Sequence, residues 1–135
     1  MRIVIDTYAW IEIFIGSQKG DRAREILSKA QEAYTPDIVL AEVARKYLRE
    51  GVEQEKVSER LEKISEASDI AAINGEVALE SAKCYMELLA RAEKAGARTP
   101  SLFDAVILGV ARVLKAKLVT SDEHFKDLPE TLWLG

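Results

Sequence analysis

Short apolar runs alternate with helix-length segments along this chain of 135 residues, and that order limits the fold more than any other feature. The pattern predicts strands at 2–5, near Tyr34, and at 69–73, 117–120 and 131–134. It predicts helices at 7–15, 21–30, 36–50, 54–66, 76–94 and 100–115, and a helical turn at 122–125. Strands that are joined by helices pair in parallel, because the chain crosses back over the sheet before the next strand. We therefore expect an α/β fold, with a mostly parallel sheet and helices on both faces.

Polar residues and prolines mark the expected helix starts. Asp21 is expected to cap the helix at 21–30, after a loop formed by SQKG. Thr35 and Thr99 each precede a proline, so each is expected to cap a helix that begins at that proline.

The length and composition fit one compact domain over residues 1–135, since 48% of the residues are hydrophobic. No apolar run is long enough to cross a bilayer. The first residues lack the basic region and long apolar segment of a secretory signal. The single cysteine, Cys84, fits a reducing compartment and is expected to lie in the core. We therefore expect a cytoplasmic protein.

The net charge of −4 excludes a protein that simply coats nucleic acid, because such proteins are usually basic. A polyanion would have to be bound by a local basic patch, by a bound cation, or by both. One cysteine and one histidine, His124, also exclude a zinc site of the usual Cys/His kind. Any metal in this chain is therefore expected to be bound by oxygen.

Two acidic residues follow apolar runs at places where parallel strands should end. Asp6 follows Ile3-Val4-Ile5, and Asp122 follows the run at 117–120. In open α/β sheets, ligands bind beyond the carboxyl ends of the strands. Asp6 and Asp122 could therefore meet at one edge of the sheet as metal ligands. Each could equally cap the helical segment that follows it, and the two roles are compatible.

Two further acids lie near the starts of predicted helices. Glu42 interrupts an apolar run in IVLAEVARKYL, and Asp104 does so in SLFDAVILGVARVL. Glu42 could pair with Lys46 on a solvated helix face, and Asp104 could be a surface residue. Four carboxylates that converged on the same edge would repel one another and raise each other's pKa. A hard cation, Mg²⁺ or Mn²⁺, would relieve that repulsion because both ions prefer oxygen ligands.

Four segments give the chain a resemblance to the PIN-domain nucleases, and specifically to the VapC-like toxins of type II toxin–antitoxin pairs. The first motif of that family is similar to IVIDTYAWIE. The second is similar to TPDIVLAEVARKY with Glu42, and the third to SLFDAVILGVAR with Asp104. The fourth is similar to LVTSDEHF, with Thr120, Asp122 and Phe125 in the family's order. The resemblance covers nearly the whole chain.

The resemblance implies a PIN-like three-layer fold, with about five strands and an acidic pocket at one edge of the sheet. It implies that Asp6 and Asp104 are the chief metal ligands. Glu42 and Asp122 would bind the metal or water attached to it. Thr7 and Thr120 would support these carboxylates by hydrogen bonds.

Two positions depart from the family pattern. Tyr8 stands where many relatives carry a smaller residue, which could change access to the pocket. Leu108 and Gly109 stand where relatives often carry alanines, a change that concerns packing.

The implied activity is endonucleolytic hydrolysis of RNA phosphodiesters, assisted by Mg²⁺ or Mn²⁺. The implied partners are the RNA substrate, a small antitoxin protein and a second copy of the chain in a homodimer. Tyr8 and Trp10 could stack a base, although Trp10 also fits a core position. His124 is expected at the surface. The candidates for substrate binding are the basic residues near the pocket: Arg45, Lys46, Arg49 and Arg98.

The residues do not fit two other classes of protein with similar features. Haloacid-dehalogenase phosphatases need a second aspartate where Tyr8 stands, and receiver domains need an aspartate and a lysine that this chain lacks at the corresponding places. Two alternatives remain open on the sequence: a catalytically inactive PIN-like scaffold that binds RNA or protein, and a PIN-like nuclease that acts on DNA.

Overall fold

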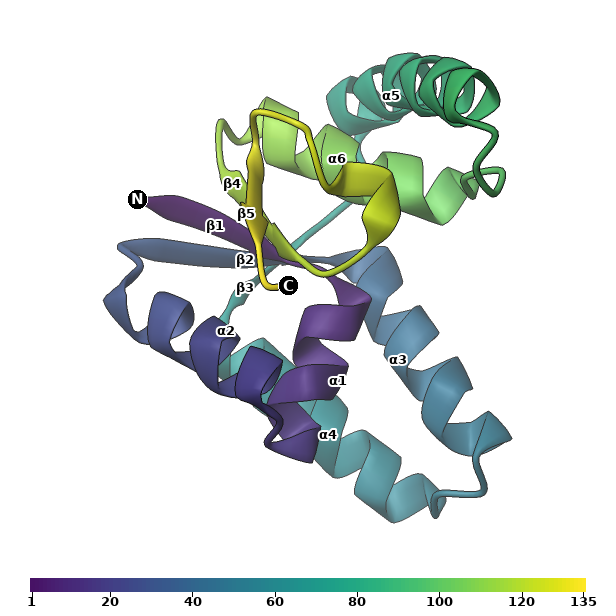
Figure 1. Ribbon diagram of the computed structural model, residues 1–135. Helices are drawn as coiled ribbons and strands as arrows, with labels where there is room; N and C mark the ends of the chain where they lie inside the picture. Colours follow the sequence, from purple (N-terminus) through teal and green to yellow (C-terminus); the bar gives the residue numbers. More distant parts are fainter.

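A five-stranded sheet lies between layers of helices in the computed structural model, which describes residues 1–135 (Figure 1). The strands lie in the order β3-β2-β1-β4-β5, and every neighbouring pair is parallel. The α/β prediction with a mostly parallel sheet is therefore confirmed. The strands are β1 (Arg2–Ile5), β2 (Glu32–Pro36), β3 (Asp69–Ala71), β4 (Lys117–Thr120) and β5 (Thr131–Trp133).

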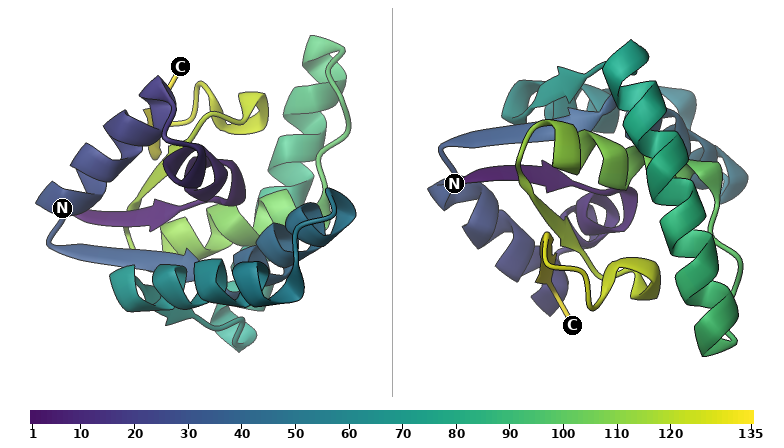
Figure 2. Two further views of the ribbon diagram at one scale, coloured as in Figure 1. Left: turned by 90° about the horizontal axis from the view of Figure 1, so that it is seen from below. Right: turned by 90° about the horizontal axis from the view of Figure 1, so that it is seen from above.

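Helices cover both faces of the sheet, as predicted. Helices α1 and α2 lie on one face, and α6 lies on the other with α5 packed outside it (Figure 2). No helix is both long enough and apolar enough to cross a membrane. The helices are α1 (Thr7–Ile15), α2 (Gln18–Lys29), α3 (Asp37–Arg49), α4 (Gln54–Ala67), α5 (Gly75–Ala95) and α6 (Leu102–Val113), followed by a 3-10 turn, η1 (Glu123–Phe125).

One cluster of 28 buried side chains joins the sheet to the helices. Cys84 is fully buried in it, as predicted. Helices α5 and α6 approach closely at Gly109, where a Cβ atom would lie only 2.4 Å from the Ser81 Oγ. Gly109 therefore has the packing role that its departure from the family pattern suggested.

Two predicted helix starts were wrong. Helix α2 begins at Gln18 rather than Asp21, because Ser17 caps it by accepting a hydrogen bond from the Gly20 amide at 3.0 Å. Thr35 does not cap a helix either, because it is the fourth residue of β2 and its hydroxyl is buried. That hydroxyl accepts a hydrogen bond from Trp10 Nε1 at 3.1 Å and bonds to the Ser68 hydroxyl at 2.7 Å.

The last long helix also begins later than predicted. Ser101, rather than Thr99, caps α6, so the prolines at 36 and 100 lie outside the helices that follow them. Proline before a helix was a correct signal for a nearby start. The exact boundary depended on other contacts, because Thr35 bonds to Trp10 and Ser68 instead of capping, and Ser101 forms a capping box with Asp104.

Candidate functional site

Asp6 and Thr120 meet where β1 and β4 end side by side. The two strands pair through Ile5 and Val119, so the residues that follow them share one edge of the sheet. Asp6 caps α1, because its Oδ1 accepts a hydrogen bond from the Ala9 amide at 2.8 Å. Its other oxygen accepts a hydrogen bond from the Thr120 hydroxyl, and the side chain is almost completely buried.

Thr120 also positions Asp122. The Thr120 hydroxyl oxygen accepts a hydrogen bond from the Asp122 amide at 2.9 Å while its hydrogen is donated to Asp6. Asp122 in turn caps η1, because its Oδ1 accepts a hydrogen bond from the His124 amide at 2.9 Å. One threonine hydroxyl therefore links two carboxylates that lie far apart in the sequence.

Asp104 and Glu42 reach the same place from two helices. Asp104 forms a capping box with Ser101: the Ser101 amide donates to Asp104 Oδ2 at 2.9 Å, and the Asp104 amide donates to Ser101 Oγ at 3.1 Å. Glu42, in α3, accepts a hydrogen bond from the Thr7 hydroxyl at 2.7 Å. Thr7 and Thr120 therefore make the hydrogen bonds to carboxylates that the resemblance implied.

All four carboxylates line one small pocket. The open space is about 10 Å³ for the centre of a water-sized sphere, which is close to the minimum for a single water molecule. A hollow of this size suits a single ion. The other lining residues are Thr7, Tyr8, Ile107 and Phe125.

The carboxylates interact strongly in this space. The pKa of the Asp6 carboxyl is raised from its ordinary 3.8 to about 7, chiefly by burial. The charges of Asp122 and Glu42 also raise this pKa, whereas the hydrogen bonds from Thr120 and Ala9 lower it. Burial also raises the pKa of Glu42. The pocket therefore holds a proton near neutral pH unless a cation balances its negative charge.

The donor set fits a hard divalent ion. Carboxylate oxygens are the ligands that Mg²⁺ and Mn²⁺ prefer in proteins. A cation in the pocket would offset the like-charge repulsion that burial makes costly. Asp104 and Asp122 each place an oxygen, and His124 a ring nitrogen, within 4.8 Å of one another.

His124 was expected at the surface, and that prediction was wrong. Its side chain is only 7% exposed. Nδ1 lies 3.2 Å from Asp122 Oδ1 and 3.6 Å from Asp104 Oδ2, and Nε2 lies 2.8 Å from the Arg98 carbonyl oxygen. The sequence offered one signal for this placement: His124 lies two residues after Asp122, which was expected to cap a helical turn.

Basic residues border the acidic pocket on one side. Arg45, Lys46 and Arg49 line an adjoining hollow of about 120 Å³, together with Thr7, Tyr8 and Glu42. Lys46 pairs with Glu50 at 2.8 Å, so the alternative in which Glu42 pairs with Lys46 does not hold. Arg45 and Arg49 are exposed and form no ion pair. The structure therefore brings this predicted strip next to the acids.

Arg98 borders the acidic pocket from the opposite direction, through His124. Its guanidinium Nη2 lies 3.4 Å from His124 Nδ1.

Trp10 is buried beside Phe14, which excludes base stacking and confirms its core position, whereas Tyr8 is 54% exposed at the pocket rim.

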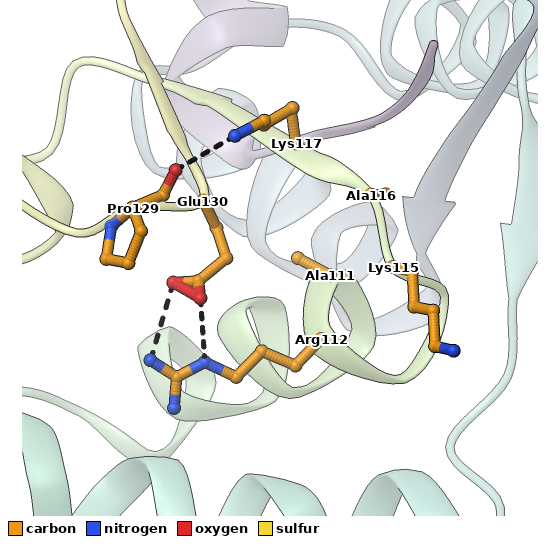
Figure 3. Close-up of a pocket in the computed structure, with 7 residues that line it drawn as sticks. All are labelled: Ala111, Arg112, Lys115, Ala116, Lys117, Pro129 and Glu130. Atoms are coloured by element: carbon orange, nitrogen blue, oxygen red, sulfur yellow. Dashed lines mark hydrogen bonds and ion pairs between the residues drawn. The ribbon is translucent and has the colours of Figure 1, made fainter.

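Another hollow lies at the opposite edge of the sheet, where β4 and β5 begin (Figure 3). It measures about 310 Å³. Most of its charged groups are already paired: Arg112 binds Glu130 at 3.4 Å and Glu87 at 2.7 Å, and Lys117 donates a hydrogen bond to the Pro129 carbonyl at 3.0 Å. Lys115 is the one charged side chain there with neither an ion pair nor a hydrogen bond, whereas the acidic pocket gathers four carboxylates, so the acidic pocket is the candidate site.

Comparison with known proteins agrees with this geometry. The sequence profile of the PIN domain matches residues 3–131. Ribonuclease VapC3 of Pyrobaculum aerophilum is 25% identical over 131 residues, which are 94% of each chain. A toxin–antitoxin complex from Klebsiella pneumoniae has a chain with a TM-score of 0.73 and 20% identity, covering 98% of both chains. A chain of VapBC2 from Rickettsia felis, bound to a DNA fragment from its promoter, has a TM-score of 0.72 and 21% identity, covering 98% of this chain and 97% of that one.

Proposed function

Since this chain belongs to the PIN domain family, we propose that it is an endoribonuclease that hydrolyses RNA phosphodiesters with Mg²⁺ or Mn²⁺. One observation carries the proposal: four carboxylates from four separate segments line a pocket the size of one ion. The ribonuclease relative, at 25% identity, supports RNA as the substrate. The proposed active-site residues are Asp6, Glu42, Asp104 and Asp122.

The resemblance to the PIN-domain nucleases suggests different roles for the four acids. Asp6 and Asp104 are the chief ligands, and Glu42 and Asp122 complete the site. When bound, a divalent ion lowers the pKa of the attacking water and neutralises charge that develops on the phosphoryl oxygens. The Thr120 hydroxyl bonds to the Asp6 carboxylate and to the backbone amide of Asp122, and so keeps both acids in position. The carboxylates of Asp6 and Asp122 accept the proton that the water loses.

The basic residues are proposed to hold the RNA backbone on both sides of the pocket. Arg45, Lys46 and Arg49 lie on the Glu42 side, and Arg98 lies beyond His124. A strand that crosses between them would place one phosphate over the acids. Attack by water predicts products with 5′-phosphate and 3′-hydroxyl ends. The single histidine leaves no histidine pair for a route through the 2′-hydroxyl.

Cleavage of a labelled RNA with Mn²⁺, and its loss in EDTA, tests the proposal. Asp104→Asn is the sharpest variant, because an asparagine oxygen can still accept the hydrogen bond from the Ser101 amide and so preserve the start of α6. Asp21→Asn is the matched control, since Asp21 is an exposed acid on α2 and far from the pocket.

We expect the wild type and Asp21→Asn to cut RNA and Asp104→Asn to lose most activity. RNA that is bound but left intact by all three proteins would favour an inactive scaffold. Cleavage of single-stranded DNA at the same rate as RNA would favour a nuclease without sugar selectivity.

We further propose that the chain is the toxin of a toxin–antitoxin pair, acts in the cytoplasm and forms a homodimer. The fold shared with toxin–antitoxin complexes supports the pairing. A basic side chain of a small antitoxin would neutralise the four acids in place of the metal. Expression of the wild type should arrest growth of a bacterial host, whereas Asp104→Asn should not. Light scattering after gel filtration tests the homodimer.

A further inference from the structure

The ring of His124 is oriented by the backbone. Nε2 lies 2.8 Å from the Arg98 carbonyl oxygen. A carbonyl oxygen only accepts hydrogen bonds, so Nε2 must carry a hydrogen. In the neutral ring, Nδ1 therefore has no hydrogen and presents its lone pair.

That lone pair faces the acidic pocket. Nδ1 lies 3.2 Å from Asp122 Oδ1 and 3.6 Å from Asp104 Oδ2. Both carboxylate oxygens are acceptors, so neither can donate a hydrogen bond to the lone pair on Nδ1. More than nine-tenths of the side chain is buried, so water does not replace a partner freely. The one donor near Nδ1 is the Arg98 guanidinium at 3.4 Å, on an exposed side chain.

We propose that His124 Nδ1 is a ligand of the divalent ion that Asp104 and Asp122 bind, and that this nitrogen makes the site favour Mn²⁺ over Mg²⁺. The inference rests on the proposed function, which places a metal ion among the acids. It adds a nitrogen donor to a site that the acids alone would make purely oxygen-based.

The geometry supports this assignment. Adjacent ligands of an octahedral ion lie about 3 Å apart when the bonds have the 2.0–2.1 Å length typical of Mg²⁺. The 3.2 Å from Nδ1 to Asp122 Oδ1 is close to this separation, and the 3.6 Å to Asp104 Oδ2 is longer. Histidines that bind metals commonly donate their other ring hydrogen to a backbone carbonyl, which is what Arg98 provides. Mg²⁺ takes oxygen ligands, whereas imidazole suits first-row transition ions, so a nitrogen ligand shifts the preference toward the latter.

The competing explanation is an imidazolium that only pairs with the two carboxylates. Electron spin echo spectroscopy of bound Mn²⁺ separates the two, because it detects a directly bound ¹⁴N. His124 is the only histidine, so an imidazole signal from a protein without a histidine tag has one origin. Mn²⁺ binding is measured in the same samples from the signal of the free ion.

We expect ¹⁴N coupling in the wild type, its loss in His124→Gln, and its retention in Arg98→Ala, which keeps the carbonyl. Loss of the ligand should weaken Mn²⁺ binding by at least about 10-fold, since the loss of even an outer-shell partner of a ligand typically costs 10- to 100-fold. Mg²⁺ binding, measured by competition, should weaken less.

Bound Mn²⁺ without ¹⁴N coupling in the wild type would overturn the assignment of His124 and leave the oxygen site intact. Equal losses of Mn²⁺ and Mg²⁺ affinity in His124→Gln would overturn the selectivity. Mn²⁺ binding that Asp104→Asn does not weaken would instead overturn the metal site of the proposed function.

Discussion

Replacing Asp6 with asparagine should make the metal-free protein more stable near neutral pH while removing its activity. Asparagine caps helices as well as aspartate does, so α1 should keep its first hydrogen bond to the Ala9 amide. The substitution removes a carboxylate that burial makes costly to ionise.

The expected size follows from the pKa of Asp6. That pKa is about 7 in the folded protein against an ordinary 3.8, so the folded state binds more protons between these values. Stability therefore falls as pH rises through this window, in contrast to a carboxylate whose pKa folding lowers. At about 1.4 kcal/mol per pKa unit, ionised Asp6 costs roughly 4 kcal/mol at pH 8, of which about 3 kcal/mol develops between pH 5 and pH 8.

Asparagine avoids this cost but loses part of a hydrogen bond. The Thr120 hydroxyl would accept from the new amide instead of donating to a carboxylate, a change of about 1 kcal/mol. We therefore expect the free energy of unfolding of Asp6→Asn to exceed that of the wild type by about 3 kcal/mol at pH 8 and by less than about 1 kcal/mol at pH 5.

Urea unfolding in EDTA at pH 5 and pH 8 measures both differences. A divalent ion at 1,000 times its dissociation constant should reverse the order at both pH values, because only the wild type gains the binding free energy, about 4.1 kcal/mol. A wild type that is equally stable at both pH values, or an asparagine variant that is less stable at pH 8 in EDTA, would refute the reasoning.

Three other substitutions test separate parts of the structure. Gly109→Ala should lower the free energy of unfolding by roughly 1–3 kcal/mol, because its Cβ would meet Ser81 Oγ at 2.4 Å; thermal denaturation measures the loss. Thr7→Val removes the donor to Glu42 and should weaken Mn²⁺ binding by about 10-fold while the melting temperature stays within a few degrees, as calorimetry can show; unchanged binding would contradict a supporting role. Arg45→Ala should weaken RNA binding and lower the slope of log K against log salt concentration by about one, measured by fluorescence anisotropy; an unchanged slope would exclude a phosphate contact.

Much of the fold could be predicted because local patterns carry it. Apolar runs of strand length and caps such as Asp6 and Asp122 depend on neighbours within a few residues. Two helix starts were misplaced locally, because Ser17 and Ser101 cap α2 and α6 in place of Asp21 and Thr99. A third error arose where distant partners decided. Thr35 lies in a strand because its hydroxyl bonds to Trp10 and Ser68, a pairing that no local pattern encodes.

The candidate site divides in the same way. The positions of Asp6 and Asp122 after apolar runs were sufficient to place them at the end of the sheet where ligands bind. Glu42 and Asp104 were harder to predict as members of the site, because an acid in a helix more often faces solvent. Only the family motifs that contain them singled them out. The burial of His124 escaped prediction, because it depends on the carbonyl of Arg98, 26 residues earlier.

The sequence alone determined the alternation of strands and helices, the parallel sheet, and the acids at strand and helix ends. Only the tertiary structure decided that β1 lies beside β4, which joins Asp6 to Thr120 across 114 residues of sequence. The physical reason is that periodicity encodes which face of an element is buried, whereas the neighbours of that face depend on the order of strands in the sheet. Burial and mutual repulsion exist only after that assembly, so the high pKa of Asp6 is a property of the fold.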